Sequence, residues 1–179
     1  MDKKEIIIMK KIFKNIEVLN IVSYVNQMSK EKLDELPLKF RWNLKKNIDK
    51  LRPIAESYEN FRNDQVKQLQ SEWFNEEKSE EFMQVKTDEN GEPMKDGEGN
   101  EITEPMRKIK DEYMVEYQKV VSELNTKLNE IAYEDNEVEI ATVDFDIFID
   151  SLPDDSSIDF DDITMLSFMD TTTNIKEAE

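Results

Sequence analysis

Carboxylates are the side chains from which this chain could build a site, because the sequence contains no histidine and no cysteine. Their absence removes imidazole bases, thiol nucleophiles, disulfides and the usual zinc ligands. Acidic residues are the most numerous of the remaining reactive types, with 42 Asp and Glu against 24 Lys and Arg. Carboxylate-bound metal ions are therefore the first chemistry to consider.

The spacing of the acidic residues does not match a known metal motif. A calcium-binding EF-hand loop requires oxygen ligands at positions 1, 3 and 5 and glycine at position 6. Loops that start at Asp88, Asp96 or Asp144 fail at the fifth or sixth position. Pro153 and Asp154 resemble part of a restriction-type nuclease core, but no lysine follows at the required spacing, and no phosphate-binding glycine motif is present. We therefore expect no enzyme, no catalytic residue, no metal and no cofactor.

The acidic residues are concentrated toward the end of the chain. The formal charge is +5 over residues 1–62, -9 over 63–133 and -14 over 134–179. The last segment also contains Phe145, Phe148, Phe160 and Phe168, and a purely solvating tail has no use for such residues. This combination favours a segment that is at least partly docked on the rest of the chain.

Two readings of the acidic segment stay open. The carboxylates could simply keep the chain soluble and separate from other chains. They could instead form a surface that binds a basic protein partner, with aromatic anchors, or that imitates a phosphate backbone. For the second reading, the candidate partner-binding residues are Asp144, Asp146, Phe148, Asp150, Asp154, Asp155, Asp159, Phe160, Asp161 and Asp162.

Basic residues cluster between Lys39 and Arg52, where they could bind phosphate or could face water or the acidic segment of the chain itself. The second interpretation is favoured, because a net charge of -18 disfavours general nucleic-acid binding. Trp42 and Trp73 lie near apolar positions of helical spacing and are interpreted as packing residues. We expect a protein partner with a basic surface and no direct nucleic-acid partner.

No run of eighteen apolar residues is present, and the apolar stretch near the start is too short for a signal peptide. The expected location is the cytoplasm of the cell that makes the protein, with virion association as an alternative. Met9 is an alternative start to Met1.

Apolar residues at helical spacing predict three main helices. The first runs from Ile12 to near Met28, and Ser29–Pro37 then forms a connector. The second continues to Trp73, and Pro53 predicts a kink or a break within residues 50–52. The third begins after Thr103, with Pro105 in its first turn, and extends to Ile131.

The remaining segments predict a smaller β component. All three glycines lie between Glu80 and Glu104, and Asn90-Gly91 predicts a β-hairpin over about 82–103. Alternating apolar and acidic residues within 137–150, among them Val143, Phe145, Ile147 and Ile149, predict a strand. A short helix is expected from Asp161 or Asp162, and disorder over the last nine residues.

The predicted fold class is mainly α with minor β. It consists of a long antiparallel helical hairpin, an N-terminal helix, a small β-hairpin at the tip, and an acidic C-terminal strand with a short helix. The predicted organisation is an N-terminal extension or short strand over 1–11, a helical domain over 12–133 with the hairpin insertion, and an acidic segment over 134–179.

Several blocks along the chain resemble a group of small helical accessory proteins of tailed phages. The blocks are Leu36-Pro37-Leu38-Lys39, Leu44-Lys45-Lys46-Asn47-Ile48, Leu51-Arg52-Pro53-Ile54, Tyr58-Glu59, Asn136-Glu137-Val138-Glu139-Ile140 and residues 163–169. They are packing motifs that specify no chemistry. The resemblance implies a phage accessory protein, either an inhibitor of a host-defence or nucleic-acid-binding protein or a factor in tail or virion assembly that acts through its helical hairpin. A homo-oligomer is compatible with either role.

Overall fold

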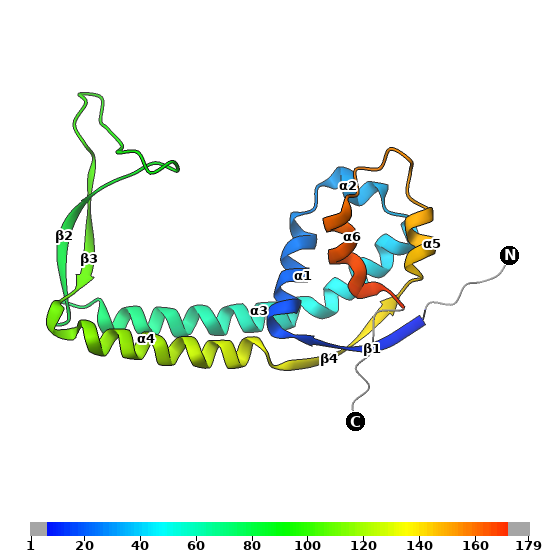
Figure 1. The fold of residues 1–179 in the computed structure, drawn as a ribbon, viewed down its shortest axis with the longest axis horizontal. Coiled ribbons are helices and arrows are strands. Elements are labelled where there is room, and N and C mark those ends of the chain that lie inside the picture. Colours follow the sequence, from blue (N-terminus) through cyan, green and yellow to red (C-terminus); the bar gives the residue numbers. More distant parts are fainter. Residues whose placement is uncertain (1–6, 172–179) are drawn as a thin grey trace. The chain divides into compact units, whose positions relative to one another are not determined.

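The computed structural model describes residues 7–171. Helices dominate, and the strands form two separate two-stranded antiparallel sheets, so the predicted mainly α class with some β is confirmed (Figure 1). The chain divides into unit 1, residues 1–61 and 129–179, and unit 2, residues 62–128. The elements in order are β1 (Ile7–Lys14), α1 (Asn15–Gln27), α2 (Lys30–Glu35), α3 (Leu38–Trp73), β2 (Ser79–Val85), β3 (Thr103–Ile109), α4 (Asp111–Ala132), β4 (Asp135–Thr142), α5 (Phe145–Asp150), α6 (Phe160–Leu166) and the 3-10 turn η1 (Ser167–Met169).

The sheet of unit 1 pairs β1 with β4, two segments far apart in the sequence. Ile12 and Phe13 lie in β1, so the prediction that the first helix starts at Ile12 is wrong. The helix α1 begins at Asn15, because the backbone N–H of Lys14 donates to the Glu17 carboxylate (2.7 Å) and caps the first turn. Pairing with β4 therefore decides the conformation of Ile12 and Phe13, which local helical spacing alone does not.

A side chain of α3 covers the outer edge of β4. The Asn47 amide donates to the backbone carbonyl of Ala141 (3.0 Å) and accepts from its N–H (2.9 Å). One side chain thus makes both hydrogen bonds that a neighbouring strand would make. Lys50 donates to the carbonyl of Glu139 on the same edge (2.6 Å).

The region around α2 and α3 departs from the predicted layout. The predicted connector contains α2, which Ser29 caps by accepting from the backbone N–H of Lys32 (3.2 Å). The helix α3 continues through Pro53, so the break, one of the two predicted alternatives near residues 50–52, is wrong, and the kink stays a prediction. Leu51 and Ala55 are buried on either side of the proline, and their packing holds the helix where one backbone donor is missing.

The predicted strand through Ile149 is also wrong, because β4 ends at Thr142 and residues 145–150 form α5. Asp144 caps this helix by accepting from the N–H of Ile147 (3.2 Å). Phe145 and Phe148, three residues apart, are both buried on one side of the short helix. A helix satisfies this burial, whereas a strand would place the two rings on opposite faces.

Unit 1 contains a single apolar core that gathers α1, α3, the sheet and the C-terminal helices. The ring of Phe148 stacks on that of Phe40 with 4.0 Å between centroids, and Phe13 meets Phe168 edge to face at 6.4 Å. Lys11 is buried, and its ammonium donates to the carbonyls of Phe168 (2.9 Å) and Asp170 (2.6 Å). These two bonds tie the segment 168–170 to β1. Disorder was predicted for the last nine residues, and all of them except Thr171 lie outside the described part of the chain.

Unit 2 contains the second sheet, in which β2 pairs with β3. Residues 103–109 form this strand, so the prediction that the third helix starts after Thr103 is wrong and α4 begins at Asp111. Between the strands the chain turns at Asn90-Gly91, where Gly91 has a φ of +82° and Thr87 bridges to Pro93. The ring of Trp73 lies 5.4 Å from that of Tyr117 on α4, and Trp73 is buried as predicted.

Candidate functional site

The predicted partner-binding residues divide into a structural group and an exposed group. Asp144 and Asp159 are the N-caps of α5 and α6, so their carboxylates are engaged with backbone N–H groups. Phe148 is only 4% exposed and belongs to the core, as do Phe145 and Phe168. These residues hold the C-terminal helices in place and leave Phe160 as the only one of the four phenylalanines that a partner could reach.

Asp162 is the centre of a buried polar cluster rather than part of a binding surface. It is 1% exposed, and its carboxylate accepts from the Tyr24 hydroxyl (2.7 Å) and the Lys32 ammonium (2.6 Å). Lys32 also bridges to Asp159 (2.8 Å). The cluster thus joins α1 and α2 to the start of α6 and satisfies a carboxylate that would otherwise be costly to bury.

The polar cluster also shifts the pKa values of its members. Burial and the hydrogen bond to Asp162 raise the pKa of Tyr24 to about 12. The hydrogen bonds from Lys32 and from the backbone N–H of Asp162 lower the pKa of Asp159 to about 2. Hydrogen bonds to the carboxylates of Asp159 and Asp162 raise the pKa of Lys32. All three shifts favour the protonation states present at neutral pH, so the cluster acts as a structural tie.

The helix α6 begins at Phe160, one residue before the earlier of the two predicted starts. Asp159 and Asp162 form a reciprocal capping box, in which each carboxylate accepts from the other residue's backbone N–H at 3.0 and 2.9 Å. Phe160 is the first helical residue and points away from the core, with 79% of its surface exposed. The helix cap therefore displays an aromatic ring beside carboxylates.

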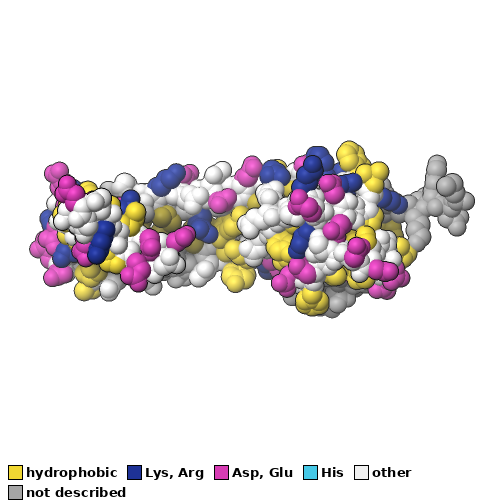
Figure 2. Space-filling view, turned by 90° about the horizontal axis from the view of Figure 1, so that it is seen from above, with side chains coloured by type: hydrophobic (Ala, Val, Ile, Leu, Met, Phe, Trp, Pro, Cys, Tyr) yellow, Lys and Arg dark blue, Asp and Glu magenta, His cyan; other side chains and the backbone are white. Residues whose placement is uncertain are grey.

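The exposed members of the predicted set form what we call the acidic patch. It comprises the carboxylates of α5, of α6 and of the loop between them, together with one aromatic ring, namely Asp146, Asp150, Asp154, Asp155, Phe160 and Asp161. Within residues 7–171, none of these carboxylates has an ion-pair partner. Ile147 and Ile149 on α5 are also exposed, and acidic and hydrophobic side chains lie next to one another on the face of unit 1 seen at the right of Figure 2.

Two lysines of the basic cluster contact side chains of α3 itself. Lys45 pairs with Asp49 one turn away (2.8 Å), and Lys46 lies 5.1 Å from the centre of the Trp42 ring. Trp42 itself is 55% exposed, so it is not a core residue, although Lys46 lies over its ring. It lies on the outer side of α3, opposite Phe40 and Leu44, which face the core.

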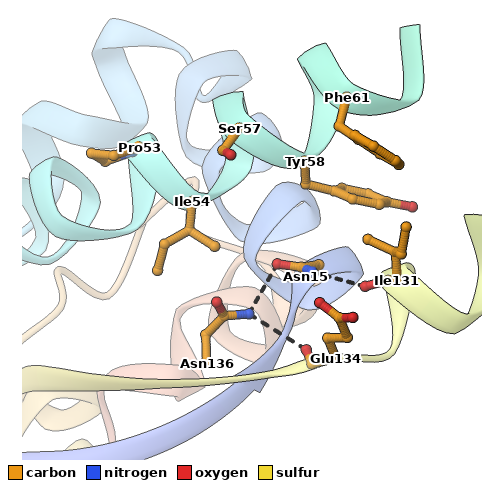
Figure 3. Close-up of a pocket in the computed structure, with 9 residues that line it drawn as sticks. All are labelled: Asn15, Pro53, Ile54, Ser57, Tyr58, Phe61, Ile131, Glu134 and Asn136. Carbon is orange, nitrogen blue, oxygen red and sulfur yellow. Dashed lines mark hydrogen bonds between the residues drawn. The ribbon is translucent and has the colours of Figure 1, made fainter. Parts of the chain in front are cut away.

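A pocket of about 540 Å³ lies in unit 1, against the middle of α3 (Figure 3). Its lining comes from α3, from the start of α1 and from the junction of α4 with β4, and comprises Asn15, Pro53, Ile54, Ser57, Tyr58, Phe61, Ile131, Glu134 and Asn136. Sequence reasoning missed this pocket, because its lining residues come from three distant stretches and share no motif.

Two asparagines form the polar floor of the pocket. Asn15 donates to the carbonyl of Ile131 (2.8 Å) and accepts from the side chain of Asn136 (2.9 Å). The Asn136 amide nitrogen also lies 3.4 Å from the carbonyls of Phe13 and Glu134. Because all three of its neighbours are acceptors, the nitrogen of Asn136 must face them and its carbonyl oxygen must face away.

Within the described residues, no three Asp or Glu side chains gather closely enough to hold a metal ion. No helix between residues 7 and 171 is both long and apolar enough to cross a membrane. The chain matches no protein-family model, and no curated protein and no solved structure is significantly similar to it. The resemblance to phage accessory proteins therefore stays a prediction.

Proposed function

We propose that this chain is a non-enzymatic accessory protein of the phage type that binds a basic protein partner through the acidic patch. The observation that carries the proposal is Phe160, which is 79% exposed at the start of α6 and lies next to the unpaired carboxylate of Asp161. An exposed aromatic ring next to a carboxylate suits an interface with a desolvated anchor and a charge-guided encounter. Inhibition of a host-defence or nucleic-acid-binding protein is one concrete form of this role.

The charge distribution supports the same proposal. Residues 134–179 carry a formal charge of -14. Among the described residues of this segment, the carboxylates of Asp135, Glu137 and Asp144 are engaged with Lys14, Lys10 and the backbone N–H of Ile147. Asp159 and Asp162 are engaged with Lys32, whereas the carboxylates of the acidic patch are left to solvent. Such a surface attracts a basic partner over several ångströms and does so less effectively as salt rises.

The test compares capture by three forms of the full chain from phage-infected host cells, followed by binding measurements with the purified captured protein. The first form is native, and the second carries Asp154→Asn, Asp155→Asn and Asp161→Asn. The third is a charge-matched control with Glu56→Gln, Glu59→Gln and Glu130→Gln, which lie outside the acidic patch.

We expect the native and control chains to retain a protein that the acidic-patch variant loses, with affinity that falls as salt is raised. Retention by all three forms with equal affinity would contradict the proposal. A Phe160→Ala variant separates anchoring from steering, because it should increase the dissociation rate more than it lowers the association rate.

The alternative function is a structural or assembly role through the helices of unit 2. The contact of Trp73 with Tyr117 supports an antiparallel hairpin of α3 and α4 there. Unit 2 also exposes apolar side chains that a partner or a second copy of the chain could cover, including Met83, Met106 and Val115, the last at 81%. If Val115→Asp abolishes capture and the acidic-patch variant does not, this alternative replaces the first.

A further inference from the structure

The pocket of unit 1 presents acceptors without a matching donor. The carbonyl oxygen of Asn136 accepts no hydrogen bond from any residue between 7 and 171, and in Figure 3 it points toward Ile54. Glu134 contributes an exposed carboxylate that has no ion-pair partner among residues 7–171. Glu134 is the only charged residue among the nine that line the pocket, so the pocket favours a positive group.

The rest of the lining suits a cation that is flat and carries an apolar stem. Tyr58 and Phe61 place aromatic rings on the α3 side of the pocket, and an aromatic ring attracts a cation over its face. Ile54, Ile131 and Pro53 form apolar walls that methylene groups could cover. A volume of about 540 Å³ is ample for an entire arginine side chain.

We infer that this pocket binds the guanidinium group of an arginine side chain presented by another protein. A guanidinium is planar, donates several hydrogen bonds in one plane and stacks on aromatic rings, whereas a lysine ammonium is a compact, strongly hydrated charge. Two of its N–H groups would reach the Asn136 oxygen and the Glu134 carboxylate, and its face would lie against Tyr58 or Phe61. The two asparagines are held by hydrogen bonds before the ligand arrives, which lowers the entropy cost of binding.

This inference does not rest on the acidic patch, because the pocket and the patch share no residue. The two sites can therefore fail separately in experiments. The chain with Asp154→Asn, Asp155→Asn and Asp161→Asn should bind an arginine probe as the native chain does.

The test is a titration of the full-length protein, labelled with nitrogen-15, with acetyl-arginine methylamide. We expect saturable shifts of the side-chain amide signals of Asn15 and Asn136. Acetyl-citrulline methylamide has nearly the same shape without the charge and should cause no saturable shift. Absence of saturable shifts with the arginine probe, or equal binding of the citrulline probe, would overturn the inference, as would tighter binding of acetyl-lysine methylamide.

Two variants locate the effect in the pocket. Glu134→Gln should weaken binding about threefold to fivefold, the range of an exposed ion pair. Glu130→Gln removes an exposed carboxylate outside the pocket lining and should leave binding unchanged. Phe61→Leu should weaken binding about twofold to threefold, because it removes an aromatic face from an exposed position. Equal loss in Glu134→Gln and Glu130→Gln would mean that the probe responds to net charge, and the assignment of the pocket would be wrong.

Discussion

Asn43 and Asn47 lie one helical turn apart on α3, are both fully buried, and should respond in opposite ways to the same substitution. Within residues 7–171, the amide nitrogen and oxygen of Asn43 have no hydrogen-bond partner. Those of Asn47 both bond to the backbone of Ala141, which is itself buried. Leucine has the same branched outline as asparagine and lacks its polar atoms, so Asn→Leu tests the two environments with one change.

The expected magnitudes follow from the hydrogen bonds. An unpaired buried amide destabilises the folded state by about 1–3 kcal/mol, and leucine also has a better helix propensity by a few tenths of a kcal/mol. After allowance for the larger methyl groups, we expect Asn43→Leu to stabilise unit 1 by about 1–2 kcal/mol. Asn47→Leu should destabilise it by about 2–4 kcal/mol, because it leaves the N–H and the carbonyl of Ala141 unpaired.

Native-state hydrogen exchange of the amides of β4 and of α3 up to Phe61 measures these changes within unit 1, so that unfolding of unit 2 does not enter. Urea unfolding followed by circular dichroism provides a second measure of the free energy of unfolding. The reasoning is refuted if Asn43→Leu lowers the stability of unit 1 as Asn47→Leu does. In that case the amide of Asn43 makes hydrogen bonds in the folded protein that compensate its burial.

Three further predictions concern the core, the polar cluster and the turn of unit 2. Phe148→Ala should lower the free energy of unfolding of unit 1 by about 3–5 kcal/mol, whereas Phe160→Ala should change it by less than about 0.5 kcal/mol in the same urea experiment. Asp159 has its pKa lowered to about 2, so its ion pair stabilises the fold above the unfolded-state pKa of about 4 and loses that effect as the pH falls through the folded-state value. The melting temperature of Asp159→Asn should accordingly lie below that of the native chain at pH 7, and the gap should close near pH 2; a gap independent of pH would exclude the charge as the cause. Gly91→Ala should increase hydrogen exchange in the turn and destabilise the turn by about 1 kcal/mol, because φ is +82° at this residue. Gly97 has open space around it and no positive φ, so Gly97→Ala should leave the exchange unchanged.

Sequence reasoning located the helices best where the apolar stripe is long. The buried residues Leu44, Ile48, Leu51 and Tyr58 follow helical spacing, and the structure places all of them on the core side of α3. Such periodicity is a property of the chain itself, since one face of a helix must be apolar wherever it packs. The start of α6 was predicted to within two residues for a similar reason, because aspartates at a helix start supply their own caps.

The candidate site was only partly predictable. Ten residues of the C-terminal segment were predicted to bind a partner because they are acidic or aromatic. An acidic or aromatic residue can equally be a helix cap, a core residue or an exposed anchor. The contact of Asp162 with Lys32 and Tyr24 and the stacking of Phe148 on Phe40 involve partners more than a hundred residues away. Sequence spacing carries no information on such partners, so the division into structural and exposed residues required the fold.

The absence of histidine and cysteine, the charge gradient toward the C-terminus and the long amphipathic helix are properties that the sequence determined by itself. Tertiary structure decided the conformation of the short ambiguous segments: residues 103–109 form a strand because β2 pairs with them, and residues 145–150 form a helix because two rings must reach one core. Short segments have local preferences of well under a kcal/mol per residue, so that distant hydrogen bonds and burial outweigh them. The pocket with Asn15 and Asn136 exists only because the same long-range contacts bring three separate stretches together.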